Sequence, residues 1–298
     1  MTSASSPRQT LSFLRNLFET RGIQPKSKLG QCFLIDLNLL DILVQMAELT
    51  PKDLALEVGS GTGGLTARLA DQAGAVLGVE IDPAFIDLLR ETLANRANVR
   101  IIHADVLKNK NEMNPKVLTA LEDMKRQGGC DHLKLVANLP YAVAVPVMGN
   151  FLISNLTFER MVVTVQGEIA ERLLAAPGTK DYGALAVLVQ SLAEVSLVRR
   201  LPPSVFWPRP QVASAIVLIR PEAGKRAQVG DVPRFRRFLR DLYVHRRKNL
   251  RGALSALLSG RRDKAEVDRK LAELGIDGTV RAEMLDVDQH LRLCAMFG

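Results

Sequence analysis

Apolar positions in the first two thirds of the chain switch repeatedly between two spacings. Short continuous apolar runs predict buried strands at 54–58, 75–79, 99–103, 133–137 and 161–165. Apolar residues three or four positions apart predict helices at 11–20, 36–49, 65–72, 83–94, 116–126 and 147–154. Strands separated by helices form a parallel sheet covered on both faces, and ligands bind beyond the carboxyl ends of its strands. We therefore expect an α/β fold with its chemistry in the loops that follow the strands.

The pattern changes near residue 200, where a proline-rich segment at 201–210 is followed by one last strand at 215–219 and then by helices only. The spacing from 231 to 259 predicts one long amphipathic helix with arginines on its outer face. We expect a tail and short helix at 1–25, with residues 1–10 disordered, an α/β domain at 26–220 and a smaller all-helical domain at 221–298. The polar stretch 106–132, which includes the helix at 116–126, is interpreted as a surface insertion.

Charge is unevenly divided along the chain, whose formal net charge is +8. Residues 1–198 contain 19 Lys and Arg against 21 Asp and Glu, a net of −2, whereas residues 199–298 contain 21 against 11, a net of +10. A near-neutral body joined to a basic end is typical of a catalytic module with a nucleic-acid-contacting module. The alternative is a solvated helix surface. The candidate phosphate contacts are Arg246, Arg247, Lys248 and Arg251.

Composition excludes several other classes of protein. The hydrophobic fraction of 47% is typical of a soluble globular protein, and the longest apolar runs are far shorter than the ~20 residues that span a bilayer. The first residues lack a signal-peptide layout. Cys32, Cys130 and Cys294 have no metal or disulfide spacing, and the four histidines are scattered. We expect no metal, no membrane partner and a location in the cytoplasm.

A glycine loop at 57–64, E-V-G-S-G-T-G-G, joins the first strand to a helix. Such a loop presents helix N–H groups to an anion, and Gly59, Gly61 and Gly64 also fit the G-x-G-x-x-G pattern of dinucleotide sites. Glu80 ends the second strand, where it can accept hydrogen bonds from ribose hydroxyls. Asp105 follows the third, where it can meet an adenine amino group. The alternative is that these acids are ordinary strand-end and turn residues.

Acids at three successive strand ends resemble the class I S-adenosylmethionine-dependent methyltransferases, which have a Rossmann-like sheet. The resemblance implies that Gly59 and Gly61 hold the methionine end of the cofactor, Glu80 the ribose and Asp105 the adenine. S-adenosylmethionine carries a sulfonium cation and no phosphate, so an acid-rich pocket suits it better than a pyrophosphate.

The fourth strand leads into Asn138-Leu139-Pro140-Tyr141, which resembles the N/D-P-P-Y/F motif of amino-methyltransferases. The exocyclic amine of adenine donates its lone pair into the ring and is a poor nucleophile. The Asn138 side-chain oxygen and the Leu139 carbonyl can accept its two hydrogens, and Tyr141 can stack on an extruded base. The alternative is a proline-containing turn after a buried strand.

Three further segments narrow the resemblance to the ribosomal RNA adenine dimethyltransferases, and in particular to the bacterial small-subunit (16S) enzymes. They are K-L-G-Q-C-F-L at 28–34, F-W-P-R-P-Q-V-A-S at 206–214 and R-R-K-N-L at 246–250 with the helical end of the chain. The resemblance implies transfer of four methyl groups to the N6 atoms of two adjacent adenosines near the 3′ end of 16S rRNA, in the immature small subunit. It also implies a monomer.

The resemblance also assigns roles to individual residues. The cofactor positions carry over to Cys32, Leu34, Gly59, Glu80, Asp105 and Asn138, and the target-base positions to Asn138, Leu139, Tyr141 and Phe206. Gln31 is expected to help order a lid over the cofactor. Cys32 departs from the family's usual Asn, so cofactor contact there is expected through the backbone, with a nucleophilic cysteine as the alternative.

Three other functions compete with this interpretation. The first is the related large-subunit enzyme that confers macrolide resistance, against which the long helical C-terminus and Arg246-Arg247-Lys248 argue. The second is a non-catalytic assembly factor of the small subunit, which an intact Asn138 and Tyr141 disfavour. The third is a dinucleotide oxidoreductase, which leaves 138–141 and the basic end unexplained.

Overall fold

The computed structural model describes residues 9–257 and 263–298. Its described residues form two compact units, one from residues up to Ala170 with Ser196–Arg220, the other from Glu171–Val195 with Pro221–Gly298. The sequence pattern put 171–195 in the first domain. These residues instead join the second unit, because α8 (Ala184–Gln190) packs against α10 (Val232–Val244). A contact between segments so far apart in the chain leaves no local signal in the sequence.

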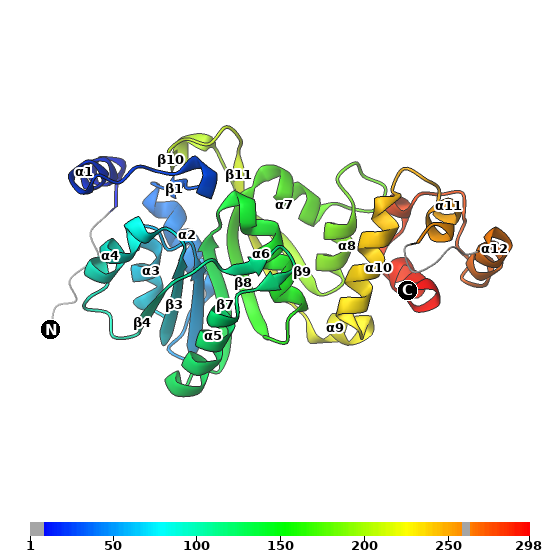
Figure 1. The fold of residues 1–298 in the computed structure, drawn as a ribbon, viewed down its shortest axis with the longest axis horizontal. Coiled ribbons are helices and arrows are strands. Elements are labelled where there is room, and N and C mark those ends of the chain that lie inside the picture. Colours follow the sequence, from blue (N-terminus) through cyan, green and yellow to red (C-terminus); the bar gives the residue numbers. More distant parts are fainter. Residues whose placement is uncertain (1–8, 258–262) are drawn as a thin grey trace. The chain divides into compact units, whose positions relative to one another are not determined.

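A seven-stranded sheet forms the middle of the first unit (Figure 1). Its order is β4 (Val99–His103), β3 (Ala75–Glu80), β2 (Asp53–Val58), β7 (His132–Asn138), β8 (Phe158–Gln166), β11 (Ser214–Pro221) and β9 (Ala193–Leu201). The first five strands in this order are parallel and β11 runs antiparallel to β8. The five predicted parallel strands are confirmed, whereas β9 was not predicted. Because β2 is flanked by β3 and by β7, the chain order reverses beside β2 and opens a crevice at the carboxyl ends of these strands.

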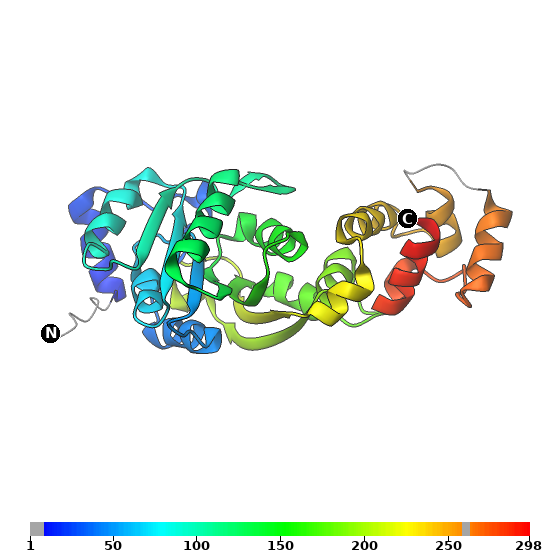
Figure 2. The same cartoon turned by 90° about the horizontal axis from the view of Figure 1, so that it is seen from below.

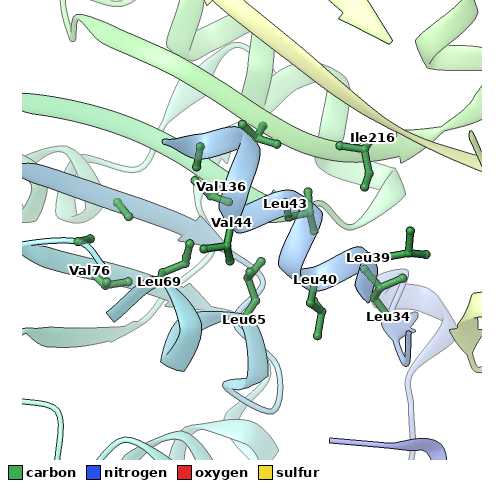
Figure 3. Packing of buried hydrophobic residues seen from close by; sticks show 14 of the residues in the cluster. Leu34, Leu39, Leu40, Leu43, Val44, Leu65, Leu69, Val76, Val136 and Ile216 are labelled. Carbon is green, nitrogen blue, oxygen red and sulfur yellow. The ribbon is translucent and has the colours of Figure 1, made fainter. Parts of the chain in front are cut away.

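Helices cover both faces of this sheet (Figure 2). They are α2 (Leu37–Ala47), α3 (Gly64–Ala70), α4 (Pro83–Thr92), α5 (Pro115–Gly128) and α6 (Tyr141–Ile153). α1 (Leu11–Arg21) packs with α4 in a second buried cluster, and α7 (Gly167–Leu174) follows β8. Leucines of α2 and α3 pack on side chains of several strands of the sheet in one buried cluster (Figure 3). The labelled members include Leu40, Leu43, Val44, Leu65, Leu69, Val76, Val136 and Ile216.

Side-chain caps fix where these helices begin. Asp36 Oδ1 accepts a hydrogen bond from the Asn38 N–H at 3.0 Å at the start of α2. Asp82 and Asn114 cap α4 and α5 in the same way, and each is followed by a proline at the first helical position. An Asp or Asn cap satisfies N–H groups that the first turn leaves unpaired, and proline is preorganised for the next position. The sequence therefore determines these starts locally.

The segment 106–132 is not a surface insertion. It contains a two-stranded ribbon of β5 (Leu107–Asn109) and β6 (Glu112–Met113) and then α5, which contacts β2 and β3. Val117, Ala120 and Leu121 of α5 are buried. The segment is thus the crossover connection that covers the sheet between β4 and β7. The sequence suggested an insertion because only a narrow stripe of α5 is apolar and the residues of its wide exposed face are polar.

The second unit is helical, with α8, α9 (Ala223–Val229), α10, α11 (Leu250–Ser255), α12 (Lys264–Glu273) and α13 (Val287–Phe297). The single helix expected at 231–259 is wrong: α10 ends at Val244, α11 starts at Leu250, and residues 258–259 lie outside the described residues. Asn249 Oδ1 accepts from the Gly252 N–H at 2.9 Å and caps α11. A side chain that bonds its own backbone competes with a continuous helix, so the apolar pattern continues while the helix does not.

Short elements complete the chain. Three 3₁₀ turns lie at Ser27–Leu29, Pro203–Val205 and Ala282–Met284, and β1 (Phe33–Leu34) pairs with β10 (Phe206–Trp207) in a separate antiparallel ribbon. Over residues 9–257 and 263–298, no helix is both long and apolar enough to cross a membrane. The same residues contain no group of three His, Cys, Asp or Glu side chains arranged to hold a metal ion.

Candidate functional site

A pocket of the first unit lies at the carboxyl ends of β2, β3 and β7 and in the loop after β4, with residues 28–33 along one side. Eight of the ten residues predicted from the sequence to hold cofactor or target base line it. They are Cys32, Gly59, Gly61, Glu80, Asp105, Asn138, Leu139 and Tyr141. The parallel topology therefore brings together residues that are more than 100 positions apart in the chain.

The glycine loop after β2 requires glycine for both conformation and space. Gly59, Gly61 and Gly63 have φ of 80°, 51° and 80°, in the left-handed region that side chains disfavour. A Cβ at Gly61 would lie 2.9 Å from the Phe33 ring, and one at Gly59 would lie 3.2 Å from Pro140. The loop backbone thus lies directly against neighbouring side chains beside the pocket.

The N–H groups of these three glycines already have partners within the protein. The Gly59 N–H donates to the Val79 carbonyl at 2.8 Å, the Gly63 N–H to the Ser60 carbonyl at 2.9 Å, and the Gly61 N–H to Glu80 Oε2 at 2.8 Å. A pyrophosphate site needs such N–H groups turned toward the ligand. The loop is therefore poorly suited to a dinucleotide, and it fits a cofactor that has no phosphate.

Glu80 and Asp105 supply acceptors in the pocket wall, at the ends of the neighbouring strands β3 and β4. Glu80 is buried, which raises the pKa of its carboxyl, and its oxygens accept from the backbone N–H groups of Gly61 and Asp82. One Asp105 oxygen accepts from the Leu107 N–H at 2.9 Å. Each carboxylate oxygen has two lone pairs, so both side chains keep capacity to accept from ligand hydroxyl or amino groups. The residues present fit S-adenosylmethionine.

Glu57, the first acid of the loop motif, lies beneath the glycine loop rather than in the main pocket. It is 2% exposed, and its Oε2 accepts a hydrogen bond from the Thr66 hydroxyl of α3. Burial raises the pKa of Glu57 to about 8, with the hydrogen bond from Thr66 opposing the rise. The protonated carboxyl therefore ties β2 to the helix that follows the loop.

Gln31 fastens the segment beside the pocket to the end of β3. Its Nε2 donates to Asp82 Oδ2 at 2.8 Å, and its Oε1 accepts from the Lys26 N–H at 2.7 Å. The Lys26 ammonium also pairs with Asp82 Oδ1 at 2.7 Å. Burial alone would raise the pKa of Asp82, but the hydrogen bonds from Lys26 and Gln31 bring it below its ordinary value. Asp82 was not predicted, although its position before Pro83 marks it as a helix cap.

Asn138 is held in place by the backbone of Cys32, the residue at which this chain departs from the family pattern. Its Nδ2 donates to the Cys32 carbonyl oxygen at 2.8 Å. This bond fixes the amide orientation and leaves Oδ1 as the available acceptor. The contact uses only the backbone of Cys32, so replacement of the family's usual Asn does not remove it. Burial raises the pKa of the Cys32 thiol, which argues against a nucleophilic thiolate.

Tyr141, the first residue of α6, is half-buried in the pocket wall. Its hydroxyl lies 2.6 Å from the Ser214 hydroxyl oxygen. The neighbouring Leu139 is also part of the pocket lining, and as a whole residue it is 1% exposed.

Two predicted site residues lie elsewhere. Phe206 is 2% exposed and belongs to the hydrophobic cluster under α2, so its ring does not line the pocket and the expectation that it contacts the target base is corrected. It pairs in register with Leu34, which is also buried in that cluster and lines only a small cavity behind the glycine loop. Both residues stabilise the ribbon that carries Cys32 and Phe33.

Gln9, which the sequence suggested was part of a disordered tail, is 6% exposed. Its Nε2 donates to the Thr62 carbonyl at 3.0 Å and its Oε1 accepts from the Thr62 hydroxyl. Residues 1–8 lie outside the described residues. Gln9, two residues before α1, thus stabilises the glycine loop, and nothing in its local sequence marks this contact.

The basic candidates of the second unit differ in their surroundings. Arg246, Arg247 and Lys248 are exposed in the turn between α10 and α11, and they form no ion pair with residues that the structure describes. Arg251 pairs with Asp268 at 2.5 Å. The first three side chains are therefore the ones available to phosphate groups.

Comparison with known proteins agrees with this geometry. A family described as "Ribosomal RNA adenine dimethylase" matches residues 22–297. The chain is 39% identical to "Ribosomal RNA small subunit methyltransferase A" of Pediococcus pentosaceus, over 94% of this chain and 92% of that protein. It is 40% identical to the protein of the same description from Pelotomaculum thermopropionicum, over 95% of each.

Solved structures share the fold. A dimethyladenosine transferase from Plasmodium falciparum matches with a TM-score of 0.71 and 24% identity, covering 88% of this chain and 96% of that one. The 23S rRNA methyltransferase ErmE matches with a TM-score of 0.61 and 26% identity, covering 89% and 99%.

Proposed function

Since this chain belongs to the ribosomal RNA adenine dimethylase family, we propose that it dimethylates the N6 amines of two adjacent adenosines near the 3′ end of 16S rRNA. The observation that carries the proposal is Asn138, whose amide is fixed by the Cys32 carbonyl with Oδ1 free, at the end of a strand beside the glycine loop. The relatives at 37–40% identity all carry the small-subunit description, which favours 16S over 23S rRNA.

S-adenosylmethionine, when bound, supplies an electrophilic methyl group on a sulfonium sulfur. The glycine loop at Gly59 and Gly61 would hold its methionine end, Glu80 the ribose hydroxyls and Asp105 the adenine amine. The Glu80 carboxyl also favours a cation electrostatically, because it is buried where water screens its charge little.

Asn138 and Leu139 act on the other reactant. The Asn138 Oδ1 and the Leu139 carbonyl accept the two hydrogens of the adenine N6 amine. In this position the nitrogen lone pair is withdrawn from conjugation and aimed at the methyl group. Tyr141 stacks on the base, which must leave its helix to reach the pocket. Positioning of this kind supplies most of the acceleration.

Proton removal needs no strong base. Once the nitrogen carries a new methyl group it is an acidic ammonium, and its proton can pass through the hydrogen bond to Asn138 toward water. No described side chain in the pocket needs to gain or lose a proton in this step. Burial raises the pKa of both the Cys32 thiol and the Tyr141 hydroxyl, so both groups stay protonated and neither acts as a base.

The second unit supplies the grip on RNA. Its residues, 171–195 and 221–298, contain 19 Lys and Arg against 14 Asp and Glu, a net charge of +5, and the exposed turn at Arg246, Arg247 and Lys248 is suited to phosphate contacts. The three cysteines are free thiols, which is consistent with a reducing compartment. We propose that the protein works as a monomer in the cytoplasm on the immature small subunit.

Mass spectrometry of small-subunit rRNA tests this function directly. Cells that lack the protein should lose dimethyladenosine at the two positions, and complementation with the wild-type chain should restore it. Persistence of dimethyladenosine in the deletion strain would mean that the substrate is assigned wrongly. Loss of ribosome assembly with normal methylation would indicate an assembly factor instead of an enzyme.

A further inference from the structure

Ser214 is the last residue of the segment F-W-P-R-P-Q-V-A-S at 206–214, and the proposed chemistry gives it no role. It is 1% exposed and is the first residue of β11. The register pairs it with Gln166 at the carboxyl end of β8, and the Gly167 N–H donates to the Ala213 carbonyl at 2.8 Å. The Ser214 hydroxyl is therefore anchored on a strand of the sheet and not on a loop free to move.

Its hydroxyl oxygen lies 2.6 Å from that of Tyr141. The Tyr141 backbone is confined as well, because it follows Pro140 and lies close to Gly30, where an added Cβ would be 3.4 Å from the Tyr141 nitrogen. The ring is thus held at both ends, by the start of α6 and by β11. A ring held at both ends cannot swing about its Cα–Cβ bond, so the direction of its long axis is fixed before any ligand arrives.

We propose that Ser214 is a positioning residue for the target purine: its hydroxyl fixes the direction in which the Tyr141 ring extends into the pocket, so that the stacked base presents its exocyclic amine to Asn138. The inference rests on the proposed function and assigns a role to a residue that does not touch the substrate.

Two features make the bond suitable for this role. Burial raises the pKa of Tyr141, so its phenol remains a neutral hydrogen-bonding group throughout the physiological range. A neutral bond costs little desolvation, contributes about 1 kcal/mol and is strongly directional. Its value lies in geometry, since misplacement of a reacting group by about 1 Å can cost about 100-fold in rate.

The experiment compares Ser214→Ala, Tyr141→Phe and the double variant, using small ribosomal subunits from cells that lack the protein. Transfer of radiolabelled methyl groups gives kcat and KM. Each single variant should lower kcat about tenfold, and the double variant should be no slower than either single one, because both remove the same bond. The KM for S-adenosylmethionine should stay within about twofold of the wild-type value, because neither residue is among those proposed to hold the cofactor.

Ser191→Ala is the matched control. Ser191 is also buried, at 3% exposure, and its hydroxyl donates to the Leu188 carbonyl at 2.8 Å in the other unit. This variant should lose thermal stability comparable to that lost by Ser214→Ala while keeping its full kcat. A purely structural role for Ser214 would make the two variants behave alike.

Three results would overturn the inference: a wild-type kcat in Ser214→Ala, losses in the two single variants that multiply in the double variant, or an equal fall of kcat in Ser191→Ala. If Ser214→Ala does not fold, Tyr141→Phe tests the same bond from the pocket side and keeps the ring, and an unchanged kcat there is equally damaging. A wild-type protein that transfers no methyl group would instead refute the proposed function itself.

Discussion

Replacement of Asn138 by alanine separates two effects that the structure assigns to one side chain. The variant loses the Oδ1 acceptor proposed for the adenine amine and the Nδ2 bond to the Cys32 carbonyl, which is 2.8 Å long. Loss of a preorganised hydrogen-bonding partner at a reacting centre costs about 100- to 1,000-fold in kcat. Loss of the second bond costs about 1 kcal/mol, or roughly fivefold in equilibrium terms, and loosens the segment beside the cofactor.

The assay measures methyl transfer to small subunits from cells that lack the protein, and binding of the same particles separately. We expect kcat to fall at least 100-fold, the KM for S-adenosylmethionine to rise about fivefold, and particle binding to change less than threefold. The kcat of Asn138→Asp should lie between that of the wild-type protein and that of Asn138→Ala, because aspartate keeps an acceptor oxygen but cannot donate a hydrogen bond to the Cys32 carbonyl.

Asn98→Ala provides the matched control within the same unit. The Asn98 amide donates to the Ala70 carbonyl at 2.9 Å and the Ala73 carbonyl at 3.0 Å, at the end of α3 and outside the pocket. This variant should melt at a lower temperature and keep its kcat. Our reasoning would be refuted if Asn138→Ala turned over within threefold of the wild-type rate, or if its particle binding fell as far as its kcat.

The other predictions concern RNA binding by the second unit and the buried side chain of Glu57 beneath the glycine loop. The double charge reversal Arg247→Glu and Lys248→Glu should weaken binding to small subunits and reduce the steepness of its salt dependence in titrations at several ionic strengths, and unchanged affinity at all of them would exclude phosphate contact. Glu57 has a folded-state pKa of about 8 against an ordinary 4.5, so the free energy of unfolding should fall as pH rises between these values, by about 5 kcal/mol at most. Glu57→Gln removes this titration: denaturant unfolding should show the variant gaining stability relative to wild type from pH 5 to pH 8, and a constant difference would contradict the assignment.

The local sequence was sufficient for much of this site. The left-handed glycines of the loop, the Asp and Asn caps before proline, and the acids at strand ends are all properties of a few consecutive residues. Their convergence followed from one further inference, that parallel strands separated by helices present their carboxyl ends at the same edge. The separation of charge between the two parts of the chain required only counting.

The sequence by itself therefore predicted eight of the residues that line the pocket, and the tertiary structure decided which of them touch and placed Leu34 and Phe206 in the hydrophobic core. Asn138 bonds the backbone of Cys32 across 106 positions, Tyr141 meets Ser214 across 73, and Gln9 reaches Thr62 across 53. Phe206 is buried in the core, and this could not be predicted from the sequence. Its strand has only two residues, which is too short for an alternation of apolar and polar positions to indicate the buried face. Periodicity reports only which side of an element is apolar. Hydrogen-bond partners depend on the register and packing of distant elements, which are settled only when the whole sheet assembles.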